Sequence, residues 1–199
     1  MSTASPESEP APNHTTAQSA PVQRQIGIFD QFVSQNMETV LLKEQVASPR
    51  FNITLANGQP ILKLENWNKK CCTWRRAMTD MQNNHLLDIV REGSFDITYV
   101  FYDPQGRKIG QVRDKSGLCR SHAEAKLQSR NGHEDTFAIT GQRWGAEIIC
   151  HRTGAVVAHR IDGPGGPCGR MRFKIIIPPG FDMALMVALG IATTLLGTG

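Results

Sequence analysis

Alternation of apolar and polar residues dominates the chain from residue 37 onward. In FNITL, residues 51–55, apolar side chains strictly alternate with polar ones, which is the pattern of a β-strand with one buried face. Similar runs recur at about ten-residue spacing: METVLLKE, RFNITL, PILKLE, WRRAMTD, HLLDIVRE, DITYVFY, KIGQVRD, HAEAKLQ, DTFAIT, AEIIC, VVAHRI and MRFKIII. Because no helical periodicity separates them, the pattern predicts roughly a dozen antiparallel strands in a sandwich or a barrel.

Turn-forming residues stand between many of these runs. Asn, Gly and Pro favour the backbone geometry of tight hairpin connections. They occur at Asn57-Gly58, Asn83-Asn84, Pro104-Gln105-Gly106, Asn131-Gly132 and Thr153-Gly154. We therefore expect neighbouring strands to pair as hairpins.

The N-terminal part differs from this β-rich region. Residues 1–24 are rich in Ser, Pro, Ala and Thr, and they carry too little apolar surface to offset the entropy of ordering. We expect a disordered tail there, followed by one domain over residues 25–199. Just after the tail, IGIFDQFVSQ predicts a short amphipathic helix. Its apolar face consists of Ile28, Phe29, Phe32 and Val33.

The segment MALMVALGIATTLL, residues 183–196, carries no charge, and it indicates a helix with Asp182 as its N-cap. Two placements are open: a membrane anchor, or a helix enclosed in the protein core. About 14 residues reach roughly 21 Å, short of the approximately 30 Å of a bilayer's hydrocarbon core. Interfacial Trp, Tyr, Lys or Arg residues are missing after the segment. We therefore favour a buried helix, with a tail anchor as the alternative.

Composition narrows the classes of protein only moderately. A net charge of +4 over 199 residues permits an anionic partner without requiring one, and we expect no nucleic acid partner. The five cysteines include the adjacent Cys71 and Cys72, which favours a reducing compartment over a disulfide framework. The N-terminus lacks the apolar stretch of a secretory signal. We expect a cytoplasmic monomer.

Candidate catalytic or metal-binding residues are sparse. HAE at residues 122–124 and PC at residues 167–168 resemble parts of the zinc-deaminase signature. However, Met171 replaces the second cysteine, and both stretches are predicted strands rather than helix starts. HED at residues 133–135 is better explained as a solvated hairpin tip than as a metal site. We therefore predict a protein without enzymatic activity, catalytic residues or cofactors.

One basic and aromatic segment is a candidate binding site. The stretch WNKKCCTWRR, residues 67–76, holds four cations and two indoles. Cations attract anionic lipid headgroups, and tryptophan favours the membrane interface. The candidate headgroup contacts are Trp67, Lys69, Lys70, Trp74, Arg75 and Arg76. The other interpretation is an exposed loop and strand edge whose charge maintains solubility. Alternation along a strand would also place Arg75 and Arg76 on opposite faces.

Six stretches follow one another in a familiar order: FDQFVSQNMETVLLKEQV, FNITLANGQPILKLE, RRAMTDMQNNHLLDIVRE, YVFYDPQGRKIGQV, AEIICHRTGAVVAHRID and FKIIIPPGFDMALMVALGI. Together they resemble the LURP-one-related family of the tubby C-terminal-like and phospholipid-scramblase-like superfamily, most closely its fungal members. The resemblance implies a mainly β fold, a roughly twelve-stranded antiparallel closed barrel around a hydrophobic C-terminal helix. The chain departs from the family in the compact hairpin GPGGPCGR, residues 163–170, and in its CCTW stretch.

The family has no agreed catalytic residues, so the resemblance implies a non-enzymatic barrel. Tubby-type domains of the superfamily bind phosphoinositides through basic surface residues, which favours peripheral binding of anionic membrane lipid. One alternative is a scramblase-like or tail-anchored membrane protein that uses residues 183–196. Another is a protein-interaction module in stress or defence signalling, as plant relatives suggest, with a protein partner in place of lipid.

Overall fold

The computed structural model describes residues 27–44, 51–65, 68–70, 73–93, 96–115, 122–128, 132–142, 145–163 and 172–196. In chain order, their elements are η1 (Asp30–Phe32), β1 (Glu38–Glu44), β2 (Phe51–Leu55), β3 (Pro60–Leu64), β4 (Asn68–Lys70), β5 (Thr73–Asp80), β6 (His85–Glu92), β7 (Thr98–Tyr102), β8 (Lys108–Asp114), β9 (His122–Gln128), β10 (Glu134–Gln142), β11 (Gly145–Cys150), β12 (Val156–Asp162), β13 (Arg172–Ile177) and α1 (Met183–Leu196). The predicted tail and most of the GPGGPCGR hairpin lie outside the described residues.

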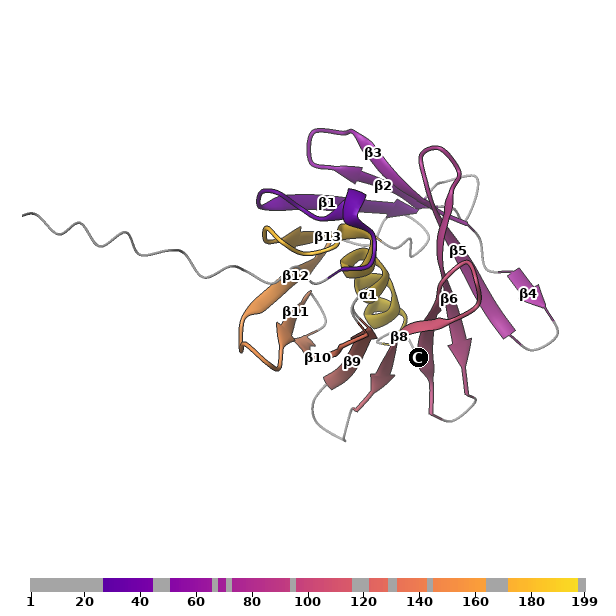
Figure 1. The fold of residues 1–199 in the computed structure, drawn as a ribbon. Helices are drawn as coiled ribbons and strands as arrows, with labels where there is room; N and C mark the ends of the chain where they lie inside the picture. Colours follow the sequence, from indigo (N-terminus) through magenta and orange to yellow (C-terminus); the bar gives the residue numbers. More distant parts are fainter. Residues whose placement is uncertain are drawn as a thin grey trace, which may run out of the picture.

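The described strands form one antiparallel ring (Figure 1). From β5 to β13 each strand pairs with the next, β13 pairs with β1, and the ring continues through β2 to β3. Pairing of β3 with β5 then closes it. Twelve of the described strands make the barrel, while β4 lies outside the ring against the first residues of β5. The predicted closed barrel is therefore confirmed.

Helix α1 occupies the interior of the barrel. Strand residues alternate between inside and outside, as on β13, where Phe173 and Ile175 are buried and Arg172 and Lys174 are exposed. The inward residues meet a helix that is apolar on all sides and buried from Ala184 to Thr193. The prediction of a buried helix is confirmed. Within the described ranges, no helix is long and apolar enough to cross a membrane.

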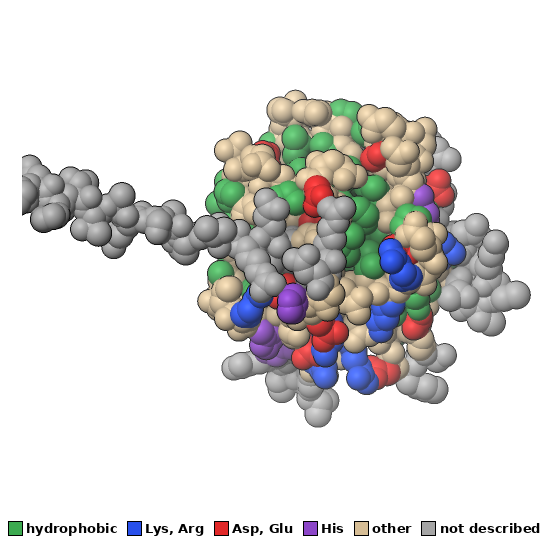
Figure 2. All heavy atoms as spheres, in the orientation of Figure 1, with side chains coloured by type: hydrophobic (Ala, Val, Ile, Leu, Met, Phe, Trp, Pro, Cys, Tyr) green, Lys and Arg blue, Asp and Glu red, His purple; other side chains and the backbone are tan. Residues whose placement is uncertain are grey.

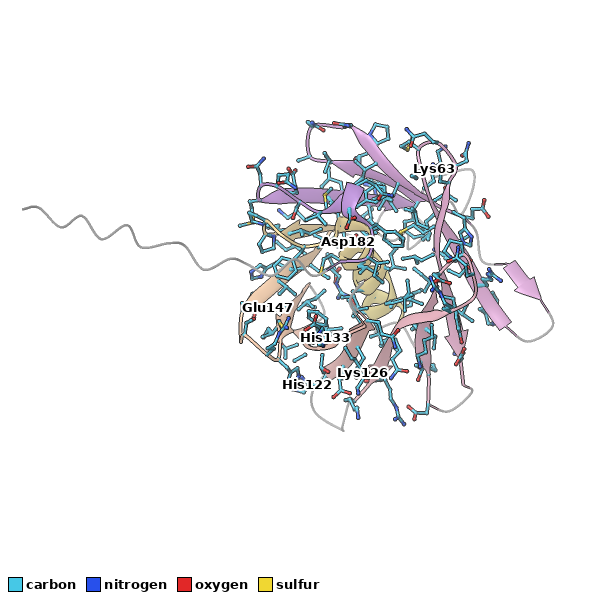
Figure 3. The ribbon with its side chains drawn as sticks, viewed as in Figure 1. Lys63, His122, Lys126, His133, Glu147 and Asp182 are labelled. Atoms are coloured by element: carbon cyan, nitrogen blue, oxygen red, sulfur yellow. The ribbon has the colours of Figure 1, made fainter. Side chains whose placement is uncertain are left out.

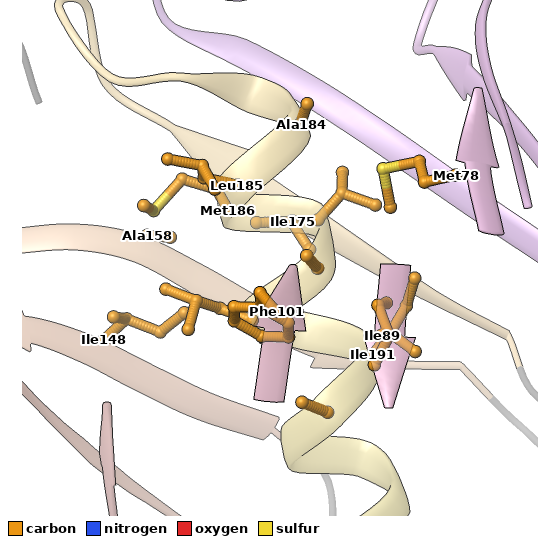
Figure 4. Packing of buried hydrophobic residues seen from close by; sticks show 14 of the residues in the cluster. Met78, Ile89, Phe101, Ile148, Ala158, Ile175, Ala184, Leu185, Met186 and Ile191 are labelled. Atoms are coloured by element: carbon orange, nitrogen blue, oxygen red, sulfur yellow. The ribbon is translucent and has the colours of Figure 1, made fainter. Parts of the chain in front are cut away.

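The barrel wall packs closely against α1. Figure 4 shows side chains from β5, β6, β7, β11, β12 and β13 beside the helix, namely Met78, Ile89, Phe101, Ile148, Ala158 and Ile175. At Gly190, an added Cβ atom would lie 2.5 Å from Ile175 Cδ1 and 3.2 Å from Phe173 Cε2. The absence of a side chain at Gly190 therefore lets α1 approach β13.

One end of the barrel, which we call the turn end, carries the tight connections after β2, β5, β7, β9 and β11. The backbone is left-handed at Gly58, Asn83, Gly106, Gly132 and Gly154, which confirms the turns predicted there; Asn131 itself is not described. Helix α1 begins at this end. Its last turn lies at the opposite end, where most connecting residues are outside the described ranges.

Residues 27–37 form a strap that lies across the start of α1. The predicted amphipathic helix is wrong, because only Asp30–Phe32 form a single 3-10 turn. The backbone N–H groups of Ile28 and Phe29 donate instead to Asp182 Oδ2, at 3.0 and 2.8 Å. Phe32 is nevertheless buried, so this part of the predicted apolar face does reach the core.

Candidate functional site

Strand β5 places the two adjacent arginines of the basic segment on opposite faces. Arg75 lies on the outer face, where its guanidinium pairs with the carboxylate of Asp88 on β6. Arg76 is only 5% exposed, and its Cζ lies 5.0 Å from the centroid of the Phe51 ring. This split follows from the alternation of side chains along a strand. Arg76 is therefore not part of the outer surface.

The charge of Arg75 is balanced by a buried carboxylate. The Asp88 side chain is 1% exposed and also lies 3.2 Å from His85 Nε2. Its hydrogen bond with Arg75 raises the pKa of that guanidinium, because it favours the charged form. Arg75 thus reaches solvent as one half of an ion pair rather than as a free cation.

The rest of the segment lies along β4 and the start of β5. Trp74 is 38% exposed. Backbone pairing sets Lys69 opposite Trp74 and Lys70 opposite Thr73, whereas Trp67 lies outside the described residues. Strand β4 lies outside the ring against one edge of the start of β5, whose other edge pairs with β6, so it extends the wall at the side of the barrel (Figure 1). We call β4 together with the start of β5 the ribbon. The structure thus brings two lysines and one exposed indole onto neighbouring strands.

Comparisons with known proteins bear on this arrangement. A family model described as LURP-one-related matches residues 38–194. The chain belongs to the LURP-one-related family. An X-ray structure of a protein from Arabidopsis thaliana is similar, with a TM-score of 0.59 and 13% identity over 84% of this chain and 95% of that one. At this identity the likeness shows the fold alone. A comparison with curated proteins gives no match.

Elsewhere on this LURP-one-related barrel, acidic and basic side chains lie next to one another, as Figure 2 shows over the lower part of the view. A cavity of about 440 Å³ at the turn end is lined by His133, Glu134, Asp135, Thr136, His151 and Arg152. Two of its carboxylates have cationic partners: Arg152 pairs with Asp135 at 2.7 Å, and Lys126 with Glu134 at 2.9 Å (His133 and Lys126 are labelled in Figure 3). Within the described ranges, no three His, Cys, Asp or Glu side chains are grouped to hold a metal ion.

The stretch that resembles a zinc-deaminase motif does not have the required setting. Residues 122–124 lie within β9, whereas that chemistry uses residues at helix starts. Its proposed partner, Cys168, lies outside the described residues.

A carboxylate at the start of α1 joins the helix to the strap. Asp182 Oδ1 accepts hydrogen bonds from the N–H groups of Ala184 and Leu185, at 2.9 and 3.2 Å. The predicted N-cap is thus confirmed, and Figure 3 shows the residue at this position. Burial raises the pKa of Asp182 to about 6, against the lowering effect of its four backbone donors.

A buried arginine lies at the other end of the helix. Arg160 Nη1 donates to the hydroxyls of Thr193 and Thr194, at 2.9 and 3.1 Å, and Nη2 donates to Asp162 Oδ2 at 3.0 Å. Burial lowers the pKa of Arg160, while Asp162 opposes this effect. Arg160 lies in a run, VVAHRI, that the sequence identifies as a strand, but the sequence does not indicate which residue of α1 it meets.

The structure also assembles cations that the sequence analysis did not connect. Lys43 is near the end of β1, and Arg172 and Lys174 lie on β13, far along the chain. Pairing of β1 with β13 brings all three to one outer face. Only the pairing of the first and last barrel strands reveals this group.

Proposed function

We propose that this barrel has no enzymatic activity and binds anionic membrane lipid, phosphoinositide in particular, at the periphery of the membrane. The proposed contact is the ribbon of β4 and the start of β5. The observation that supports it is the placement of Lys69 and Lys70 on β4, outside the closed ring, next to the exposed Trp74 of β5. A tryptophan beside lysines suits the interface of an anionic bilayer.

The geometry reduces the number of cations that can act together. Arg76 is buried, and Arg75 is balanced by Asp88, so the proposal rests on Lys69 and Lys70. Each lysine near an anionic surface contributes about 1 kcal/mol, and the pair therefore about 30-fold in affinity. Binding of this strength is weak, and salt should screen it strongly.

The test is sedimentation of the protein with liposomes that contain phosphoinositide. The variant Lys69→Ser/Lys70→Ser should lose about 30-fold in affinity. A control, Lys108→Ser/Lys126→Ser, removes the same charge from elsewhere on the barrel and should bind like the wild type. The proposal fails if the wild type ignores these liposomes at low salt, or if the β4 variant binds as tightly as the control. Both variants should keep the wild-type melting temperature if these lysines act on lipid binding alone.

A protein-interaction module is the second candidate, and one observation favours it. Within the described part of the chain, β4 pairs with β5 alone, so its other edge has no partner strand there. An exposed edge can accept an added strand from another protein. The scramblase-like or tail-anchored alternative has less support, because it requires the buried helix α1 to leave the barrel.

A further inference from the structure

Several exposed cations of the described surface pair with carboxylates, and three of the cations that do not pair lie together. The paired cations, each with its carboxylate, are Arg75 with Asp88, Arg107 with Asp103, Arg113 with Asp96, Lys126 with Glu134, and Arg152 with Asp135. Lys43, Arg172 and Lys174 are exposed and make no ion pair within the part of the chain that the structure describes.

The three cations lie close together because of the β1–β13 register. Lys43 is directly opposite Arg172, and side chains so placed have Cβ atoms about 5 Å apart. Lys174 follows two residues along β13 on the same face, about 7 Å away. The group therefore covers a small area of the barrel wall with three positive charges.

Among the side chains that the structure describes, the neighbours of this group supply apolar surface rather than negative charge. Lys174 stands opposite Leu41 on β1 and Ile161 on β12, and Ile161 is 40% exposed. On β2, the residue opposite Lys43 is Asn52. Like charges directly opposite each other destabilise a sheet, so these three cations do not stabilise the folded barrel. An anionic partner would offset their mutual repulsion.

We propose that this β1–β13 face, made of Lys43, Arg172 and Lys174 with Ile161 of the neighbouring β12, docks on an anionic bilayer surface. Both strands are paired on both sides, so a peptide cannot add to them through backbone hydrogen bonds. A partner must therefore bind through the side chains on the outer face of the sheet. Cations beside an exposed aliphatic side chain suit a bilayer, which presents anionic headgroups over a hydrocarbon layer.

This inference rests on the proposed membrane binding and gives it a second contact surface. Lys43 and Arg172 lie near the same end of the barrel as Thr73, where β5 begins. Only β2 and β3 separate β1 from β5 around the ring. Two strands of the wall therefore lie between the β1–β13 face and the ribbon.

The experiment compares two variants on vesicles of phosphatidylserine in phosphatidylcholine. Lys43→Ser/Arg172→Ser/Lys174→Ser should lose about 150-fold in affinity, from about fivefold for each cation. The matched control, Arg107→Ser/Lys108→Ser/Lys126→Ser, should stay within about threefold of the wild type. The first variant should also melt no lower than the wild type, because it relieves repulsion between opposite residues.

The outcomes separate this inference from the proposed function. If the β1–β13 variant binds like the wild type while Lys69→Ser/Lys70→Ser loses affinity, the second surface is refuted and the ribbon stands. If the wild type ignores the phosphatidylserine vesicles, the second surface is refuted; if it also ignores the phosphoinositide liposomes, both are refuted. Binding of soluble polyglutamate as tight as binding of vesicles would overturn the choice of a bilayer and indicate an acidic protein partner.

Discussion

Replacement of Asp182 by alanine tests the contact that joins the strap to α1. The carboxylate is 0% exposed and accepts four backbone hydrogen bonds, two on each oxygen. Asp182→Ala leaves these N–H donors without their acceptor, and two of them belong to the first turn of α1. It therefore weakens both the helix cap and the attachment of the strap.

Two opposing contributions set the size of the effect. Hydrogen bonds to a charged group contribute about 1.5 kcal/mol or more each, so four contribute about 6 kcal/mol. This sum is an upper bound, because even with these donors the pKa of Asp182 rises from 3.8 to about 6, so at neutral pH the charged form stays disfavoured by roughly 3 kcal/mol relative to the protonated form. Loss of the helix cap costs about 1 kcal/mol, and each of the two strap donors left unpaired costs about 1 kcal/mol, so Asp182→Ala should lower the free energy of unfolding by about 3 kcal/mol.

The pH dependence gives a second readout, with a definite sign. The pKa of Asp182 is higher in the folded than in the unfolded protein, so the folded state takes up a proton first as the pH falls. Stability from this group is therefore fully present below the unfolded pKa and is lost as the pH rises through about 6. The gap between wild type and variant should widen by about 2 kcal/mol from about pH 7 to about pH 4.

Urea unfolding at several pH values measures both quantities, with Glu65→Ala as an exposed control that should show neither effect. A variant as stable as the wild type at neutral pH would refute the structural role of the four hydrogen bonds. A gap that narrows on acidification would refute the raised pKa.

Two further changes test the packing of α1. Gly190→Ala gains about 1 kcal/mol in helix propensity, but its added methyl group overpacks the contact with Ile175, which costs about 1–3 kcal/mol. The melting temperature of this variant should therefore fall. A rise would show that the barrel wall can move to accommodate the methyl group. Removal of residues 180–199 deletes the helix that fills the barrel and should give unfolded or insoluble protein, since each large buried side chain contributes about 2 kcal/mol. A soluble truncated chain that melts cooperatively would contradict this.

The strands and turns follow from the sequence because their causes are local. Alternation in FNITL and a left-handed residue such as Gly58 depend only on neighbouring positions. Closure of the ring does not follow from local sequence. It depends on the pairing of β1 with β13 and of β3 with β5, which joins residues far apart in the chain. Alternation alone left a sandwich and a barrel open, and the family resemblance decided between them.

The strap shows where local periodicity fails. Its apolar spacing predicts an amphipathic helix, but a buried carboxylate far along the chain binds the backbone donors of Ile28 and Phe29. A tertiary contact thus overrides the local preference. In β5, by contrast, the local pattern is sufficient: alternation along the strand predicts that Arg75 and Arg76 lie on opposite faces.

The candidate site is predictable from the sequence only in part, because it too depends on contacts between residues far apart in the chain. Composition identifies the segment that holds Lys69 and Lys70, but it cannot show that Asp88 balances Arg75. Nor can it place Lys43 opposite Arg172. Both facts are consequences of strand register, which no single stretch of the sequence determines.

Charges at the two ends of α1 are structural, and the proposed membrane contacts lie elsewhere, on the barrel surface. Asp182 lies at the N-terminus and Arg160 beside the last turn, each with the sign that the helix dipole favours. Both are buried and hydrogen-bonded, so neither is available to a ligand. The ribbon and the β1–β13 face lie outside these contacts. The proposed lipid contacts would therefore leave the strap, α1 and the ring in place, unlike a mechanism that releases α1 into the membrane.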